Sequence, residues 1–527
     1  MNRRKFLGYA TIGFGAAAGG LAVWSPFKGG RSVAAKSVAN PNFVPDVEIA
    51  LTAEPGQVQI FNGKPTLIRH YVASVLKGPA EAVQTIENSY LGPIFRVKTG
   101  QKIRVRFTSQ INQETIVHWH GLHVPEQADG HPRYVIDKGE TYVYEFVVAN
   151  RAGTYWFHPH PHGKTGPQVY SGLAGLFLVS DDEEQALGLP SGSYDLPLVI
   201  QDRTFDRNNQ LVYLTGGRMQ RMTGFLGNQI LVNGQPEASF NVASNVYRLR
   251  LLNGSNSRIY KVAWSDGTPL TVIGTDGGLL EKPVGKPYMM LGPAERIELW
   301  VDFSQYNVGD RPKLVSLPFS GAGGMGMMGG GMMGVGRRRR GRSLPNGSGF
   351  DLMRFNITKK EKPGSKLPEK LSTIPAVHVA EAINTNRPRS FTFAMGMGTA
   401  TINGRTFQMT RVADDEIVKL NTAEVWELIN GGGRGMGMMG GGMMQMPHPV
   451  HVHGLQFRII ERTPGAGWSS MKDGFVDSGR KDTVLLMPGM RAKILLRFED
   501  FTGLYLYHCH NLEHEDMGMM RNYLVKA

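Results

Sequence analysis

The sequence predicts an all-β fold of three tandem antiparallel β-sandwiches. Its 527 residues are enough for about three domains. Short stretches of alternating polar and apolar residues, separated by Gly, Pro and Asn turns, are typical of such sandwiches. A similar set of stretches recurs at intervals of roughly 150 residues, which is close to the size of one domain.

Each repeat contains an alternating strand that can bury one face in a core. These strands are expected at residues 102–107, 247–252 and 424–429. A later strand ends at a histidine in the first and third repeats, but not in the middle one. The later strands are expected at residues 153–158 and 503–508, and at 295–301 and 313–318 in the middle repeat. We therefore expect the middle repeat to hold the other two in place, without chemistry of its own.

The histidines are clustered. One His-X-His pair would indicate little, because isolated histidines are commonly surface or hydrogen-bonded residues. Here four groups each contain such a pair, and alternation along a strand places both imidazoles of a pair on one face. Eight imidazoles can therefore converge, which predicts a cluster of metal ions. The groups hold twelve of the 15 histidines: His118, His120 and His123; His158, His160 and His162; His448, His451 and His453; His508, His510 and His514.

Cys509 is the only cysteine and stands between His508 and His510. In a strand its side chain points to one face and the two imidazoles point to the other, so this segment joins two metal sites. A thiolate with two imidazoles and a weak axial thioether is the blue-copper set, and His514 and Met519 follow closely. A structural zinc site closes with four ligands and would not need a thiolate tied to a histidine pair. The sequence therefore predicts copper.

The motifs that begin at His118, His158, His448 and His508 resemble, in order, the four copper signatures of the multicopper oxidases. The chain resembles most the exported bacterial cuprous oxidases of the CueO type and the McoA-like metallo-oxidases with methionine-rich segments. This resemblance implies cupredoxin-like Greek-key β-sandwich domains. It also implies four copper ions: one type 1, one type 2 and two type 3.

The resemblance further implies a role for each motif residue. The type 1 ligands would be His448, Cys509, His514 and Met519; the type 2 ligands His118 and His451; and the type 3 ligands His120, His158 and His510 for one ion and His160, His453 and His508 for the other. His123 and His162 have no ligand role in the family pattern. Catalysis would use Cys509 for electron transfer and Asp129 and Glu515 as the acids that supply protons.

The predicted organisation follows the repeats and two insertions. We expect a signal peptide at residues 1–35, domain 1 at 43–182, domain 2 at 190–358 with a Met/Gly/Arg-rich insertion at 321–345, a linker at 359–370, and domain 3 at 371–527 with a Met/Gly-rich loop at 431–446.

The first residues predict export. Arg3 and Arg4 precede an uncharged Gly/Ala-rich stretch, which is typical of a twin-arginine signal, with small residues at 32–35 as a cleavage site. The alternative is a membrane anchor, although the stretch is short and weakly hydrophobic. We expect a periplasmic protein that is a monomer and has no stable membrane insertion after processing. The single cysteine excludes an internal disulfide bond.

The formal charge of +14 does not indicate nucleic-acid binding. Five of the positive charges lie in the leader and five more in one arginine cluster at residues 337–342, which leaves a balance of +4 elsewhere. No nucleic-acid-binding module is recognisable. The arginine cluster is interpreted as a solvated loop, with contact to an anionic surface as the alternative.

The segment Gly-Met-Gly-Met-Met-Gly-Gly-Gly-Met-Met occurs twice, at residues 324–333 and 435–444. Its glycines favour mobile loops, and soft thioether sulfur selects Cu(I). The predicted substrate-binding residues are Met439, Met443, Met444 and Met446, with Met395 and Met397 as weaker candidates. Met444 stands where the related cuprous oxidases have an aspartate. The alternative is a low-complexity insertion or a sacrificial oxidation surface.

These features predict an enzyme that oxidises Cu(I), and also Fe(II), by one electron at a time and reduces dioxygen to water, serving copper tolerance. That reduction needs four electrons, and four coppers can store them. A laccase-like oxidase of phenolic and other organic substrates is the alternative enzyme. A non-catalytic copper reservoir would explain the methionines but not eight convergent histidines. Copper-free division and folding proteins of the same architecture are disfavoured for the same reason.

Overall fold

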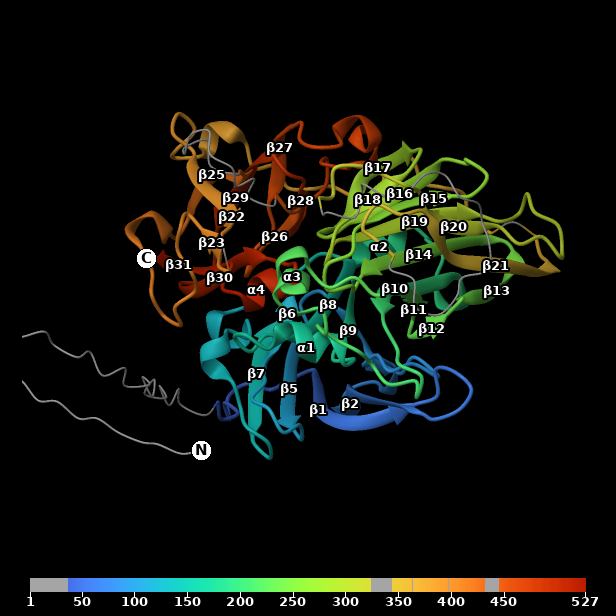
Figure 1. Ribbon diagram of the computed structural model, residues 1–527, viewed down its shortest axis with the longest axis horizontal. Helices are drawn as coiled ribbons and strands as arrows, with labels where there is room; N and C mark the ends of the chain where they lie inside the picture. The colour runs from blue at the N-terminus through green and yellow to red at the C-terminus, as the bar shows by residue number, and fades with distance from the viewer. Residues whose placement is uncertain (1–36, 324–343, 363, 397, 432–444) are drawn as a thin grey trace, which may run out of the picture. The chain divides into compact units, whose positions relative to one another are not determined.

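The computed structural model describes residues 37–323, 344–362, 364–396, 398–431 and 445–527. All described residues belong to one compact unit. Within these residues the elements are mainly β-strands, arranged in six sheets (Figure 1). The predicted all-β fold class is confirmed. The domain boundaries stay a prediction.

The first third of the chain forms two sheets. One has the order β2-β1-β5-β7 and the other β3-β4-β9-β8-β6. Their strands are β1 (Val47–Val58), β2 (Thr66–Lys77), β3 (Val83–Gln84), β4 (Ile94–Lys98), β5 (Lys102–Ser109), β6 (Val117–His120), β7 (Thr141–Val147), β8 (Gly153–Pro159) and β9 (Gly175–Ser180).

The middle third forms the sheets β12-β11-β10-β14-β19-β16-β17 and β13-β21-β20-β15-β18. Their strands are β10 (Asp195–Arg203), β11 (Gln229–Val232), β12 (Gln235–Pro236), β13 (Ser239–Ser244), β14 (Val246–Asn253), β15 (Tyr260–Trp264), β16 (Leu270–Thr275), β17 (Gly278–Lys286), β18 (Met289–Leu291), β19 (Arg296–Asp302), β20 (Lys313–Ser316) and β21 (Phe350–Lys360).

The last third forms the sheets β23-β22-β25-β29-β27 and β24-β31-β30-β26-β28. Their strands are β22 (Arg389–Met395), β23 (Ala400–Ile402), β24 (Ile417–Lys419), β25 (Thr422–Asn430), β26 (His448–Val452), β27 (Arg458–Thr463), β28 (Thr483–Leu486), β29 (Arg491–Phe498), β30 (Gly503–Cys509) and β31 (Met520–Lys526).

Helices are short and connect the strands. The α-helices are α1 (Thr165–Tyr170), α2 (Asp182–Ala186), α3 (Gly217–Thr223) and α4 (Leu512–Asp516). Single 3-10 turns occur at Ala80–Ala82, Glu126–Ala128, Pro132–Tyr134, Gly192–Tyr194, Val379–Glu381, Asp414–Glu416, Trp468–Ser470 and Lys472–Gly474. Among the described residues, none of the helices has the length and apolar character needed to span a bilayer.

The threefold repeat is visible in the strand pairing. The predicted alternating strands are β5, β14 and β25, and each pairs in parallel with an earlier strand and antiparallel with a later one. The sheets are therefore mixed rather than purely antiparallel. In each repeat the two parallel strands are not consecutive in the sequence. The chain therefore reaches the second of them by a crossover connection.

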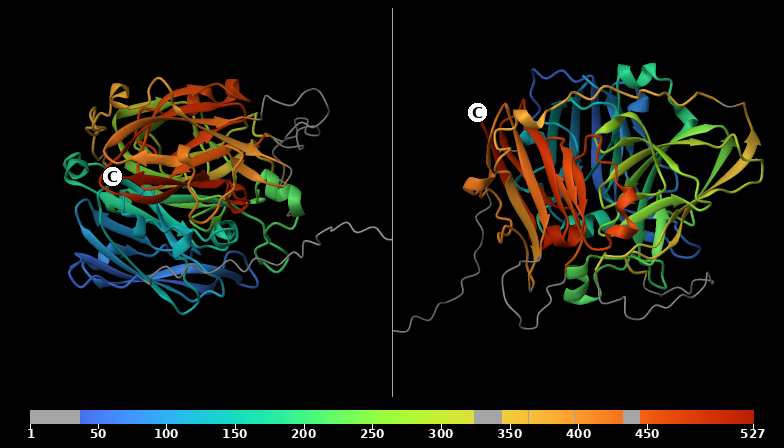
Figure 2. Two further views of the ribbon diagram at one scale, coloured as in Figure 1. Left: turned by 90° about the vertical axis from the view of Figure 1, so that its left-hand side faces the viewer. Right: turned by 90° about the horizontal axis from the view of Figure 1, so that it is seen from above.

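The same pairing relates the second sheets of the three repeats. Strands β6 and β8 in the first repeat occupy the positions of β26 and β30 in the last, and of β15 and β20 in the middle. The middle pair carries no histidine. Figure 2 shows the strands of the first and last repeats, in blue to teal and in orange to red, from two further directions.

Candidate metal centre

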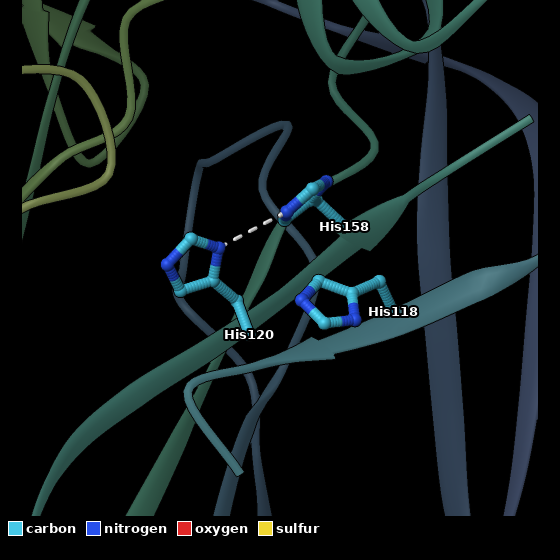
Figure 3. A group of neighbouring side chains, drawn as sticks. All are labelled: His118, His120 and His158. Carbon is cyan, nitrogen blue, oxygen red and sulfur yellow. Dashed lines mark hydrogen bonds between the residues drawn. The ribbon is translucent and has the colours of Figure 1, made fainter. Parts of the chain in front are cut away.

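The histidine-bearing strands divide their side chains between two faces. On β6, Trp119 is fully buried and packs against the rings of Tyr144 and Phe157, at centroid distances of 5.2 and 5.4 Å. Its neighbours His118 and His120 point to the opposite face of the strand. They lie opposite β8, where His118 pairs in register with His158. Figure 3 shows His120 and His158 turned toward each other from these two strands.

Strands β26 and β30 repeat this division in the last third of the chain. Val450 and Val452 lie in the hydrophobic core, as do Tyr507 and Cys509, while the histidines between and beside them face the other way. In register, Val450 pairs with Cys509 and His451 with His508. Alternation thus places Cys509 on one side of β30 and His508 on the other, as the sequence predicted.

Cys509 lies in a small site of sulfur and nitrogen atoms. Its Sγ is 3.3 Å from Nδ1 of His448 and 3.7 Å from Nδ1 of His514, and these three residues form a group able to hold a metal ion. Met519 is fully buried in the same core, and its backbone carbonyl accepts a hydrogen bond from the Cys509 amide. One thiol, two imidazoles and a nearby thioether fit copper.

Burial sets the protonation of this site. Burial away from solvent lowers the pKa of His448 and lowers the pKa of His514 to about 4. Both imidazoles are therefore neutral at neutral pH and can bind a metal ion. Burial also raises the pKa of the Cys509 thiol. Metal binding must therefore displace the thiol proton, which makes the affinity depend on pH.

Eight further histidines meet between the first and last repeats. All of them are buried, and their ring nitrogens approach one another from strands of both repeats. The short distances are 3.3 Å for His118 Nε2 to His451 Nε2; 3.4 Å for His120 Nδ1 to His158 Nε2; 3.4 Å for His158 Nε2 to His510 Nε2; 3.4 Å for His160 Nε2 to His508 Nε2; and 3.0 Å for His453 Nε2 to His508 Nε2.

Proton placement shows why a cation fits here. Nδ1 of His118 donates to the carbonyl of Asp129 at 2.6 Å, and Nδ1 of His451 donates to the carbonyl of Asp482 at 2.8 Å. Burial lowers the pKa of both rings well below the usual range. Nearby histidines add to this effect at His118, and at His451 burial outweighs the opposing influence of the Asp482 carboxylate. Each ring is therefore neutral, and its Nε2 carries a lone pair. Two lone pairs that face each other at 3.3 Å are suited to bind a metal ion.

The predicted acids contact different histidines of this cluster. Asp129 is fully buried, with Oδ2 at 2.8 Å from Nδ1 of His453, and burial raises the pKa of its carboxyl group. Glu515 is also buried, with its carboxylate 3.2 Å from Nδ1 of His508 and 3.6 Å from Nε2 of His160. Both can therefore exchange protons with the space that the histidines surround.

The remaining predicted residues are placed as follows. His123 bonds the carbonyl of Gly454 at 2.6 Å and the carboxylate of Asp500 at 2.8 Å, and His162 packs against Phe407, so neither joins the cluster. Met446 and Met395 are both buried, and Met395 belongs to the hydrophobic core of the last repeat. Met397, Met439, Met443 and Met444 lie outside the described residues, as do the arginine cluster at 337–342 and the two methionine-rich repeats.

The sequence analysis missed Asp482. This buried carboxylate lies 3.0 Å from Nε2 of His120, and it forms a potential metal-binding group with His120 and His451. Its only local signal is a charged pair, Lys481-Asp482, directly before the apolar strand β28. Charged residues at a strand end are usually solvated, so the pattern could not single it out.

Comparisons with known proteins agree with this site. Family models described as multicopper oxidase match residues 68–184 and 381–527. Multicopper oxidase mco of Staphylococcus aureus is 32% identical over 438 residues, covering 82% of this chain and 81% of the relative. The crystal structure of McoA multicopper oxidase from the hyperthermophile Aquifex aeolicus has 32% identity and a TM-score of 0.74, covering 92% of this chain and 97% of that one.

A further relative carries a different name. Cell division protein FtsP of Pectobacterium atrosepticum is 28% identical over 534 residues, covering 100% of this chain and 99% of the relative.

The two matched regions of the multicopper oxidase models contain all twelve clustered histidines and Cys509. The chain therefore belongs to the multicopper oxidase family, as an oxidoreductase whose cofactor is copper and whose substrates are dioxygen and a reducing compound.

Proposed function

We propose that this protein is an exported metallo-oxidase that takes single electrons from Cu(I), and also from Fe(II), and reduces dioxygen to water. It would hold four coppers on the ligand sets that the family resemblance implies. The observation that carries the proposal is the placement of Cys509 between His508 and His510 on β30, with each side chain in its own buried site. One strand thus joins the electron-accepting site to the histidine cluster.

Bound copper would supply one-electron chemistry at the Cys509 site and dioxygen reduction at the cluster. The protein supplies position and protons. Strands β6 and β8 on one side and β26 and β30 on the other hold the eight imidazoles at the junction of two repeats. Asp129 and Glu515 deliver protons from their places beside His453 and His508.

The surroundings of His514 favour a small reductant. This ring is fully buried, and its Nε2 donates to the backbone carbonyl of Met222 at 2.9 Å. Helix α3, which contains Met222, lies beside α4, which contains His514 (Figure 1), and therefore covers the outer edge of the imidazole. A bulky phenol cannot stack on this edge, whereas an electron from a metal ion can pass through the hydrogen-bonded carbonyl.

The flanks of the methionine repeats support Cu(I) as this reductant. Gly323, which precedes one repeat, lies against the backbone of Gln445, which follows the other, and near the thioether of Met446. Met446 is two residues from His448, so their α carbons are within about 7 Å. Both repeats thus begin or end beside a predicted type 1 ligand, where soft thioethers would select Cu(I).

The biological setting is part of the proposal. A twin-arginine leader would export the folded, copper-loaded protein to the periplasm, where oxidation of Cu(I) would serve copper tolerance. The alternative of a copper reservoir does not explain why the Cys509 strand joins a single-thiolate site to a cluster of eight histidines. A copper-free role, as in division proteins of this architecture, does not explain it either.

Steady-state rates with Cu(I), Fe(II) and a model phenol test the proposal on the copper-loaded protein. Deletion of residues 324–333, of 435–444, or of both should lower kcat/KM for Cu(I) several-fold and leave the phenol rate unchanged. Replacement of the methionines by leucines at full loop length is the matched control for loop shape. Equal losses for all three reductants would make the loops structural, and a high phenol rate that no loop change affects would favour the laccase-like alternative.

A further inference from the structure

Arg296, on the first residue of β19 in the middle repeat, is a fully buried guanidinium with all five N–H groups hydrogen-bonded. Nε donates to the carbonyl of Thr154 on β8 at 3.0 Å. The two terminal nitrogens donate to the carbonyls of Ala294 and Asp276 at 2.9 and 3.0 Å, and both donate to the carboxylate of Asp482. One side chain therefore joins all three repeats.

Asp482 carries this contact to the histidine cluster. Its Oδ1, which accepts from Arg296 at 2.8 Å, also lies 3.0 Å from Nε2 of His120, and its backbone carbonyl accepts from Nδ1 of His451 at 2.8 Å. A carboxylate only accepts hydrogen bonds when it is ionised, so His120 must donate from Nε2. The lone pair of His120 is then on Nδ1, which faces His158 at 3.4 Å.

A glycine beside His120 leaves space for the Arg296–Asp482 ion pair. Gly121, directly after His120, has a φ of +85°. A Cβ at this position would collide with the Asp482 carboxylate and would lie 2.9 Å from the Arg296 guanidinium. The pair thus packs against the backbone of the metal-binding strand, where only glycine fits.

We propose that Arg296 is a positioning residue of the copper cluster, by which the copper-free middle repeat orients His120 and His451 through Asp482. Its planar fork fixes both carboxylate oxygens, so Asp482 cannot rotate away from His120. The hydrogen bond from Nε2 then selects the tautomer that leaves Nδ1 free for a metal. This inference rests on the proposed histidine-bound copper cluster.

Arg296→Lys tests this role, because lysine keeps the charge and loses the fork. Copper-free protein is titrated with copper, and the type 2 electron paramagnetic resonance signal and the blue absorption of the Cys509 site are followed separately. We expect the affinity of the cluster for copper to fall by about 10- to 100-fold, which is the usual effect of losing a hydrogen bond to a metal-binding histidine. Binding at the Cys509 site should be unchanged.

Arg248→Lys is the matched control. Arg248 is another buried arginine of the middle repeat, and it binds Glu298 and Glu184 without contacting a histidine. Thermal unfolding of each copper-free variant reports any general loss of stability. The proposal is overturned when both variants weaken the cluster equally, or when Arg296→Lys weakens the two copper sites in parallel.

A measurement on the unaltered copper-free protein does not depend on whether a variant folds. Nitrogen NMR of labelled imidazoles should show His120 protonated at Nε2, and protonation at Nδ1 would overturn the inference. Failure of the proposed function would give a different result. The unaltered protein would then bind copper only at the Cys509 site, or not at all, whichever nitrogen of His120 is protonated.

Discussion

Glu515 is a buried carboxylate between two imidazoles from different repeats, His160 and His508. Burial alone would raise the pKa of its carboxyl group, but the two histidines outweigh this effect and lower the pKa to about 2. Interaction with the Thr165 side chain lowers the pKa further. A charged carboxylate in contact with two rings of the cluster is suited to passing protons inward.

Glu515→Gln should slow dioxygen reduction by about 100-fold or more, because the amide cannot carry a proton. The blue absorption should persist, since Glu515 does not contact Cys509 or its neighbouring imidazole His448. Single-turnover reoxidation of the reduced protein by dioxygen measures the effect. Glu513→Gln is the control, because Glu513 bonds Tyr213 and Ser257 instead of the cluster. Loss of colour in Glu515→Gln would show that the residue is structural.

At the scale of a single element, one face of strand β6 packs in the hydrophobic core and the other carries histidines of the cluster. Trp119 fills the sandwich core while His118 and His120 line the cluster. The indole Nε1 of Trp119 has no hydrogen-bond partner, so its contribution is packing alone. The core therefore determines where both imidazoles lie.

Trp119→Ala should lower the free energy of unfolding by about 3–5 kcal/mol, because it leaves a cavity in a packed core. Trp119→Phe should cost less, since it keeps a ring and removes the unpaired N–H. Urea unfolding of copper-free protein measures both, so that bound metal does not contribute. Equal losses in the two variants would contradict a packing role.

At the scale of the whole molecule, a buried group of charged residues in the middle repeat bonds the first repeat. Glu298 on β19 pairs with Arg248 and Arg250 and accepts a hydrogen bond from Thr154 of the first repeat at 2.7 Å. Burial raises the pKa of Glu298, but the two arginines outweigh it and lower the pKa to about 2. A lowered carboxyl pKa stabilises the fold above the unfolded value of about 4.5, and this stability is lost as the pH falls toward 2.

Glu298→Gln should therefore destabilise the protein most at neutral pH, by about 3–5 kcal/mol, because it removes one carboxylate partner from each of two buried arginines. The difference from the unaltered protein should narrow as the pH falls below about 4.5. Urea unfolding across this range measures it. Asp351→Asn, which removes an exposed partner of Lys313, should cost less than about 1 kcal/mol at any pH. A Glu298→Gln effect that does not change with pH would contradict the ion-pair explanation.

The sequence predicted those features that depend on local periodicity. Alternation on β6, β8, β26 and β30 was enough to place each histidine pair on one strand face and Cys509 on the other. It could not predict the parallel strand pairs, which depend on crossovers between distant segments. Nor could it predict Asp482 and Arg296, which lie 186 positions apart and meet only through the packing of different repeats. The middle repeat was consequently assigned no chemistry, whereas Arg296 bonds the carboxylate that contacts His120.

In the proposed mechanism, the position of Cys509 on β30 would also fix a tunnelling distance. The sequence determines the number of covalent bonds between the Cys509 sulfur and the imidazoles of His508 and His510. The lengths of these bonds hardly vary with temperature or solvent. Substitutions elsewhere can alter the driving force for an electron to arrive or depart. They leave the span that it crosses between the two sites unchanged, so variants that keep β30 intact should share one electronic coupling.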